Sequence, residues 1–173
     1  MPLSNQGSLK DRYTFVPRTL IFLTHQDRIL LLRGSSNKRL WANLYNGLGG
    51  HIERGEDVLS AAQRELHEET GLDQVPLWLC GVITIDTGQD SGVVVFVLRG
   101  ELNQEKIDSS VEGTPEWIQM DKIHGLPVVE DLPILLPRVL ACRLEDPPFL
   151  AHYHALPDSP LKIEFNRLGM PDV

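Results

Sequence analysis

The sequence has little of what marks several large classes of protein. It contains only two cysteines, Cys80 and Cys142, and they lack the paired spacing of a zinc site. No apolar run approaches the roughly 18 residues that a membrane span requires. Residues 1–12 are polar and do not resemble a signal peptide. We therefore expect a cytoplasmic protein with reduced, packed thiols and no membrane partner.

Basic charge is also scarce. The chain has 16 lysines and arginines against 24 aspartates and glutamates, and its formal net charge is -8. Because a general nucleic-acid binder normally carries a basic surface, we expect no nucleic-acid partner. An acidic balance does not exclude a phosphate-bearing substrate, since a bound cation can invert the local charge.

What is present fits one globular domain. The 173 residues are 42% hydrophobic, which is enough for a core, and we expect a single domain over residues 1–173. Runs rich in Ile, Leu and Val predict strands, and apolar residues at helical spacing predict two helices. The predicted strands are 19–24, 28–33, 77–86, 92–102 and 116–120, the predicted helices are 58–71 and 130–144, and a terminal hairpin is predicted within 148–165. This mixture predicts an α/β or α+β sandwich.

Three glutamates near the end of the first predicted helix are the most informative charges. Glu65, Glu68 and Glu69 are three, four and one positions apart, so their carboxylates share one helix face. The helix macrodipole disfavours anions there, and no lysine or arginine follows three or four residues later. A solvated acidic face is one interpretation. A bound divalent cation is the other, and carboxylate oxygens favour Mg²⁺ or Mn²⁺ over zinc.

The surrounding pattern is more specific than the three acids. Gly50, five residues, Glu56, seven residues and then "RELHEETGL" follow one another. This stretch is similar to the Nudix box at every specified position. The predicted elements over residues 14–143 also resemble a Nudix domain, with 144–173 as a C-terminal hairpin extension. The resemblance implies an α/β/α sandwich with a mixed central sheet and a Mg²⁺ cofactor that Mn²⁺ can replace.

The resemblance also implies a role for each matching residue. A fourth carboxylate would come from the segment "VEGTPEW", where a plain loop acid is the alternative and Glu116 is the rival. The implied metal ligands are Glu65, Glu68, Glu69, Glu112 and the backbone carbonyl of Gly49. The implied structural residues are Gly50, Glu56, Arg64 and Gly71, with Glu56 and Arg64 bracing the loop against the helix. Glu65 and Glu112 are the candidates for the general base.

Further residues resemble one Nudix branch, the oxidised-purine nucleoside triphosphatases. "NGLGG" is similar to the "NGFGG" of that branch, and "WIQMDKI" to a segment that precedes its base-reading acidic pair. Here that pair would be Glu130 and Asp131, although the branch has two aspartates. Asn46 would read a purine edge with its amide. Apart from the resemblance, Arg33 at the end of "ILLLR" is placed to contact a phosphate. The alternatives are a turn residue, a helix cap and a surface arginine.

Two other pairs of residues remain open. Trp41 and Trp117 either stack on a base or pack in the core. His152 and His154 alternate on a predicted strand and share a face, where an ordinary hairpin surface is favoured over a metal pair.

The leading interpretation is a Mg²⁺-dependent pyrophosphohydrolase of a nucleoside triphosphate, with an oxidised purine such as 8-oxo-dGTP as one candidate. A second is a hydrolase of ADP-ribose or another nucleoside diphosphate derivative, although the branch signatures for coenzyme A, NADH, ADP-ribose and diadenosine polyphosphates are missing. A third is a catalytically silent nucleotide sensor, which would not need all three box glutamates. The expected partner is a small-molecule nucleotide, and the expected state is a monomer or a homodimer.

Overall fold

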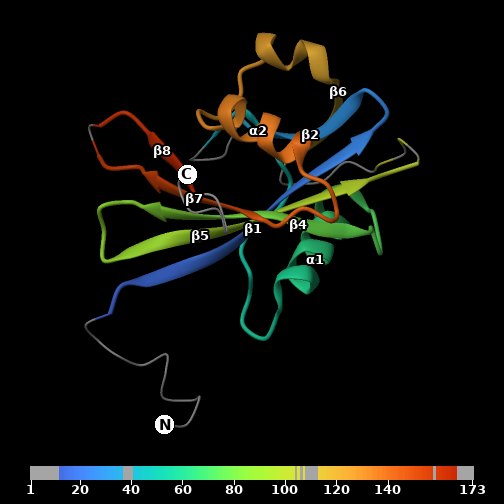
Figure 1. The fold of residues 1–173 in the computed structure, drawn as a ribbon. Helices are drawn as coiled ribbons and strands as arrows, with labels where there is room; N and C mark the ends of the chain where they lie inside the picture. The colour runs from blue at the N-terminus through green and yellow to red at the C-terminus, as the bar shows by residue number, and fades with distance from the viewer. Residues whose placement is uncertain are drawn as a thin grey trace.

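A computed structural model describes residues 12–36, 41–103, 105, 107, 113–157 and 159–166. One eight-stranded sheet lies between helix α1 on one face and helix α2 with the 3-10 helix η2 on the other (Figure 1). The strands are β1 (Thr14–His25), β2 (Arg28–Gly34), β3 (Tyr45–Asn46), β4 (Leu77–Asp86), β5 (Ser91–Glu101), β6 (Gly113–Gln119), β7 (Phe149–His154) and β8 (Lys162–Asn166). The helices are α1 (Val58–Thr70), η2 (Met120–Gly125) and α2 (Leu132–Ala141). The predicted α/β/α sandwich is confirmed.

The sheet is mixed, as predicted. Its strand order is β3-β2-β1-β5-β4-β7-β8, and β6 pairs with β2 along the whole of that strand, from Arg28 to Gly34. The pairs β1–β5 and β4–β7 are parallel, whereas the other pairs are antiparallel. Because β7 pairs with β4, the C-terminal hairpin continues the central sheet. The division into a core at 14–143 and an extension at 144–173 stays a prediction.

Local sequence explains where the helices begin and end. Asp57 caps α1, because its carboxylate accepts hydrogen bonds from the backbone N–H groups of Leu59 and Ser60 at 2.8 and 2.9 Å. Gly71 ends the helix in the left-handed conformation, with φ of 70°. Pro133 lies in the first turn of α2, and Pro137 lies inside that helix without ending it.

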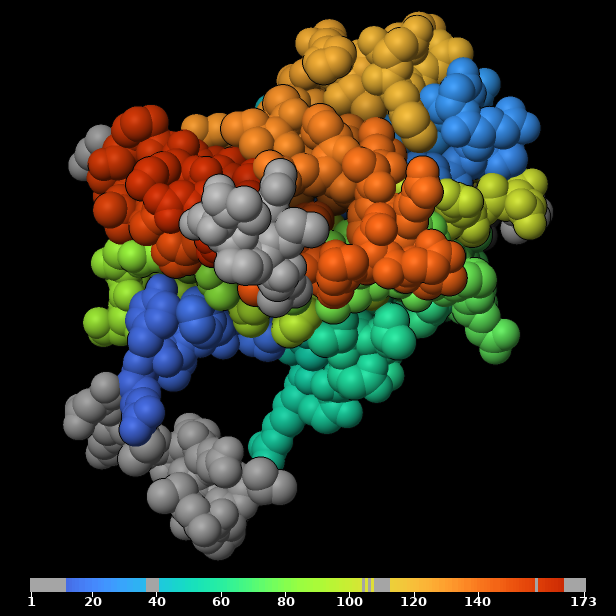
Figure 2. Space-filling model, in the orientation of Figure 1, coloured from blue at the N-terminus to red at the C-terminus, as the bar shows by residue number. Residues whose placement is uncertain are grey.

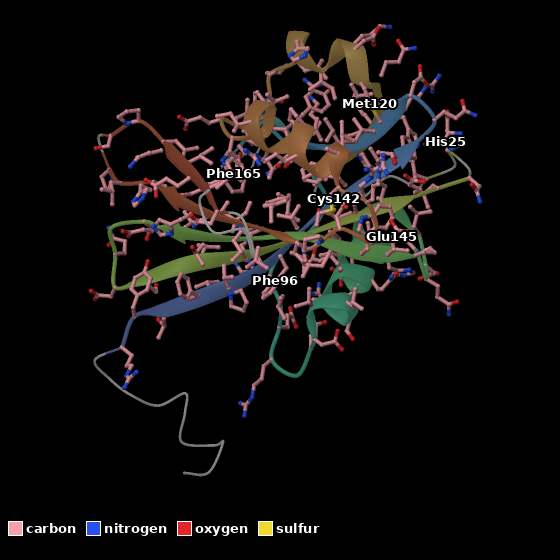
Figure 3. The ribbon with its side chains drawn as sticks, in the orientation of Figure 1. His25, Phe96, Met120, Cys142, Glu145 and Phe165 are labelled. Carbon is pink, nitrogen blue, oxygen red and sulfur yellow. The ribbon has the colours of Figure 1, made fainter. Side chains whose placement is uncertain are left out.

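Alternating side chains give the sheet one apolar cluster on each face. On β1, Ile21 and Leu23 pack toward α1, whereas Leu20 and Phe22 pack toward α2. Figure 3 shows the same division further along, with Phe96 on the α1 side and Phe165 on the side of α2 and the hairpin. In Figure 2, α2 and the β7–β8 hairpin form one continuous surface, and α1 projects from the opposite face. The position of a residue on a strand therefore decides whether its side chain lies on the α1 face or the α2 face of the sheet.

Candidate active site

A loop between β3 and α1 fills the edge of β1 that β2 leaves open. β2 pairs with β1 only from Leu23 to His25. Before Leu23, the backbone N–H of Thr19 donates to the carbonyl oxygen of Gly50, and that of Ile21 donates to the carbonyl oxygen of Leu48, each at 2.8 Å. The loop is thus fixed to the sheet before it reaches α1, and the glycine pair at positions 49 and 50 is held between β1 and the helix.

Both of these glycines occupy positions that reject a side chain. Gly49 has φ of 118°, and a Cβ there would lie 2.6 Å from the carbonyl oxygen of Thr19. A Cβ on Gly50 would collide with the Glu65 carboxylate, whose Cδ would be 2.7 Å away. The loop backbone therefore lies directly against a box carboxylate, which accounts for the two adjacent glycines in the sequence.

Glu69 is the most deeply buried of the three box glutamates. It is 2% exposed, and its carboxylate accepts a hydrogen bond from the backbone N–H of Gly49 at 2.8 Å. Such a bond to an ionised group is among the stronger hydrogen bonds in proteins. The contact ties the end of α1 to the loop on β1, so Gly49 and Glu69 meet although they are twenty residues apart in the sequence.

Arg64 donates hydrogen bonds to four residues of the box region. Its guanidinium donates to both oxygens of Glu56 at 2.7 and 3.1 Å, and to the backbone carbonyl of His51 at 2.9 Å. It also donates to Glu65 at 2.9 Å and to Glu68 at 3.1 Å. The hydrogen bond from Arg64 is the main reason that the pKa of Glu56 lies below its ordinary value. The expected pair of Glu56 and Arg64 is thus present.

The contacts of Arg64 correct one step of the sequence reasoning. The three glutamates were expected to lack a compensating cation because none follows them in the helix. Arg64 compensates two of them from the other direction, one residue before Glu65 and four before Glu68. Repulsion among the carboxylates is therefore smaller than the sequence alone indicates.

The donor groups fit a hard divalent cation. Glu65, Glu68 and Glu69 supply carboxylate oxygens from one helix, and no described residue donates a hydrogen bond to the carbonyl oxygen of Gly49. Oxygen donors of this kind suit Mg²⁺ or Mn²⁺. In the described part of the chain, no three carboxylate, imidazole or thiol groups are gathered as a ready metal cluster. Arg64 and the N–H of Gly49 engage the carboxylates in this conformation.

The proposed fourth carboxylate, Glu112, lies outside the described residues. Its rival, Glu116, is described and points away from α1. Glu116 pairs with Leu31 on the α2 face, and its carboxylate accepts a hydrogen bond from the Tyr45 hydroxyl at 2.9 Å. Since α1 covers the opposite face, Glu116 does not belong with the box carboxylates.

The base-reading candidates come from two neighbouring segments. The backbone N–H of Tyr45 donates to Pro127 at 2.8 Å, and that of Val129 donates to Tyr45 at 3.1 Å. This pairing brings β3, which contains Asn46, alongside the chain that leads into Glu130 and Asp131. The side-chain oxygen of Asn46 accepts a hydrogen bond from the N–H of the next residue, Gly47, at 2.8 Å.

Asp131 does not act as a helix cap. It occupies the N-cap position of α2 but makes no capping hydrogen bond with its side chain. Burial raises the pKa of its carboxyl, whereas Tyr153 lowers it in part. The Tyr153 hydroxyl is buried and makes no hydrogen bond of good geometry with a described residue. No sequence pattern indicates Tyr153, because only the parallel β4–β7 pairing brings it under α2. Glu130 is exposed.

The other candidates divide between the two faces. Arg33 is exposed at the end of β2, with its guanidinium 5.9 Å from the ring centre of Tyr45 on the α2 face. Trp117 packs toward the α1 face, and its indole N–H donates to the carbonyl of Glu105 at 2.9 Å, so it is a packed residue. Trp41 is 47% exposed, which rules out the core interpretation for that residue.

The histidines of the hairpin share a face, as expected. The ring centres of His152 and His154 are 4.4 Å apart. A ring nitrogen of His152 lies 2.8 Å from the hydroxyl oxygen of Thr84, and one of His154 lies 3.8 Å from Glu164. These contacts are those of an ordinary hairpin surface.

Comparison with known proteins agrees with this geometry. The family model described as NUDIX domain matches residues 14–139. The chain belongs to the Nudix family. Its described helices include none long and apolar enough to cross a membrane. As a Nudix hydrolase it is an enzyme, and its family acts on small-molecule nucleotide substrates with divalent metal ions.

Particular relatives carry named activities. The chain is 33% identical over 106 residues to the oxidized purine nucleoside triphosphate hydrolase of Danio rerio, covering 61% of this chain and 67% of the relative. It is 30% identical over 129 residues to the protein of the same name from Mus musculus, covering 72% and 81%. Its fold matches the mutator MutT protein of Bacillus halodurans with a TM-score of 0.72 and 24% identity, covering 88% of this chain and 98% of that one.

Proposed function

We propose that this Nudix hydrolase is a Mg²⁺-dependent pyrophosphohydrolase of purine nucleoside triphosphates, with an oxidised purine such as 8-oxo-dGTP as the leading candidate. The observation that carries the proposal is the arrangement of Asp131. Its carboxyl is left free by the helix it precedes, its pKa is raised by burial, and its segment runs beside Asn46. The names of the Danio rerio and Mus musculus relatives support the same substrate class.

The box residues would supply the hydrolytic part of the reaction. Glu65, Glu68, Glu69 and the Gly49 carbonyl would hold Mg²⁺, with Glu112 as a proposed fourth carboxylate and Mn²⁺ as a possible substitute ion. The bound metal would offset phosphate charge and lower the pKa of water. Glu65 and Glu112 remain the candidates for accepting the proton of the attacking water. Arg64, braced by Glu56, would orient Glu65 and Glu68 toward the substrate.

The base would be read where β3 runs beside the segment that leads into α2. Because the Asn46 oxygen accepts from Gly47, its amide nitrogen is the group directed to an acceptor on the purine. A protonated Asp131 adds a second donor, which distinguishes it from an ionised aspartate. Glu130, which is exposed, would contact the base at the rim, and Arg33 would contact a phosphate. Gly50 and Gly71 serve the backbone geometry of the box.

The cellular compartment and the oligomeric state are proposed alongside the activity. Cys80 and Cys142 are buried free thiols, which supports a reducing compartment, and we propose the cytoplasm. A monomer or a homodimer stays a prediction. Hydrolysis of ADP-ribose or of another nucleoside diphosphate derivative is the alternative activity, and a silent nucleotide sensor is the non-enzymatic one.

A nucleotide panel tests the proposal. Purine and pyrimidine triphosphates, an 8-oxo-purine triphosphate and ADP-ribose would each be incubated with the protein and Mg²⁺, with pyrophosphatase coupled to phosphate detection. For ADP-ribose, phosphatase replaces pyrophosphatase, because the products are two monophosphates. We expect kcat/KM to be highest for a purine triphosphate. Preference for ADP-ribose would select the alternative hydrolase, and no turnover of any nucleotide that binds would select the sensor.

A further inference from the structure

Arg18 is a partly buried cation for which the box gives no role. It lies on β1 two residues before Leu20, so its side chain leaves the sheet on the face that carries α2. Within the described residues, it makes no ion pair and its side chain makes no hydrogen bond. The other partly buried arginines among the described residues each have an acceptor: Arg28 has Glu105, and Arg64 and Arg99 have several. A partly buried arginine without a hydrogen-bond acceptor is uncommon, because nothing offsets the free-energy cost of removing its charge from water.

Arg18 lies beside the loop of the Nudix box. The backbone of Arg18 forms a bridge with His51, so this residue borders the box loop where Gly50 touches Glu65. Burial lowers the pKa of Arg18, and the negative charge of Glu65 partly offsets that effect. The charge of Glu65 therefore acts on Arg18, although the Arg18 side chain leaves the sheet on the α2 face.

The guanidinium of Arg18 also contacts the ring of Trp41. The carbon centre of the guanidinium lies 5.9 Å from the centre of the Trp41 ring, a cation–π distance. Trp41 has φ of 60°, a left-handed conformation that is strained for a bulky residue. Its carbonyl accepts from the backbone N–H of Leu44 at 3.1 Å, and Gly34 exchanges backbone hydrogen bonds with Asn43 and Leu44 at 3.0 Å. A strained, half-exposed tryptophan with this contact points to a functional position.

We propose that Arg18, supported by the ring of Trp41, is a further substrate-binding residue that contacts the phosphate chain between the base site and the box carboxylates. The inference rests on the proposed function for the direction of the substrate. An arginine stacked on an aromatic ring keeps its planar donors free at the edge, and those donors match phosphate oxygens. The substrate would supply the acceptors that Arg18 lacks among the described residues.

The test uses a ligand without a base. Inorganic tripolyphosphate with Mg²⁺ would be titrated by calorimetry into the full-length wild-type protein and into Arg18→Met, Arg18→Lys and Trp41→Leu. We expect Arg18→Met to weaken binding about tenfold to a hundredfold, the range for a lost charged hydrogen bond. Arg18→Lys should recover part of the loss because it keeps the charge. Trp41→Leu should weaken binding less, since the cation remains.

Arg138→Met is the matched control. Arg138 also stacks on an aromatic ring, with its guanidinium carbon 3.8 Å from the ring centre of Phe165, but it lies on α2 against the hairpin. Its loss should leave tripolyphosphate binding unchanged. Unchanged binding in Arg18→Met would overturn the proposal, and so would an equal loss in both methionine variants.

Hydrolysis of the preferred purine triphosphate separates this inference from the proposed function. Arg18→Met should raise KM by a similar factor and change kcat less, while the thermal unfolding temperature stays close to that of the wild type. If KM is unchanged although the wild type hydrolyses purine triphosphates, the proposed function stands and the role of Arg18 falls. If the wild type hydrolyses none of them but Arg18→Met loses tripolyphosphate binding, the phosphate contact stands and the nucleotide assignment falls.

Discussion

Replacement of Glu68 by Gln separates the chemistry of the box from its stability. The side chain is 53% exposed, and its described contact is an ion pair with Arg64 at 3.1 Å. Exposed pairs of this kind contribute about 0 to 1 kcal/mol, and removal of an anion near the helix C-terminus returns part of that amount. We therefore expect a change in unfolding free energy of about 0.5 kcal/mol or less.

The expected effect on catalysis is far larger. Glu68 is a proposed metal ligand, and a neutral amide is a weaker donor to Mg²⁺ than a carboxylate. We expect the rate to fall about 10³-fold, which corresponds to roughly 4 kcal/mol in the activation barrier. Initial rates at saturating nucleotide and Mg²⁺ would give kcat, and urea denaturation of the same samples would give the free energy of unfolding.

Glu53→Gln is the matched control. Glu53 is an exposed acid on the same box loop, at a position that the box pattern does not specify. The variant removes the same charge nearby and should keep the wild-type rate within about twofold, a difference of roughly 0.4 kcal/mol in the barrier. A Glu68→Gln enzyme with near-wild-type kcat would refute the metal role of the helix. So would a rate loss that only followed a loss of folded protein.

Two further predictions concern the base side of the site. Asn46→Ala and Asp131→Ala should each raise KM for the preferred purine triphosphate. Each should also reduce discrimination against pyrimidines about tenfold or more, because a buried polar group loses its partner. Equal losses on every nucleotide in steady-state assays would point to structural roles. Since the folded-state pKa of Asp131 is raised by burial, its contribution to stability is present below its unfolded pKa of about 3.9 and is lost as pH rises through the folded value. Asp131→Asn should remove that loss, and denaturation curves of both proteins that shift in parallel from acid to neutral pH would contradict it.

Much of the fold could be predicted because its signals are local. The periodicity of α1 and its stop at Gly71 lie close together in the sequence, and the β1–β2 hairpin joins adjacent runs. The two-residue strand β3 and the short helix η2 were not predicted. β3 has no pattern of its own and is defined by its neighbours at β2 and Pro127.

The candidate site divides in the same way. The box residues follow one another in the sequence, so their spacing alone brings Glu56, Arg64 and Glu65 together. Tyr153 and Arg18 gave no such signal, because their positions depend on the parallel pairs β4–β7 and β1–β5, which join segments far apart in the chain. Sequence patterns therefore indicate the box residues, whereas the positions of Tyr153 and Arg18 follow from the topology of the sheet.

Product analysis with the preferred purine triphosphate tests the central claim most directly. The protein would be incubated with the nucleotide and Mg²⁺, with a parallel sample in excess chelator, and the products would be separated by ion-exchange chromatography without pyrophosphatase. We predict nucleoside monophosphate and pyrophosphate in equal amounts with Mg²⁺, and no turnover in chelator. Nucleoside diphosphate with orthophosphate, or undiminished turnover in chelator, would contradict a metal-dependent pyrophosphohydrolase.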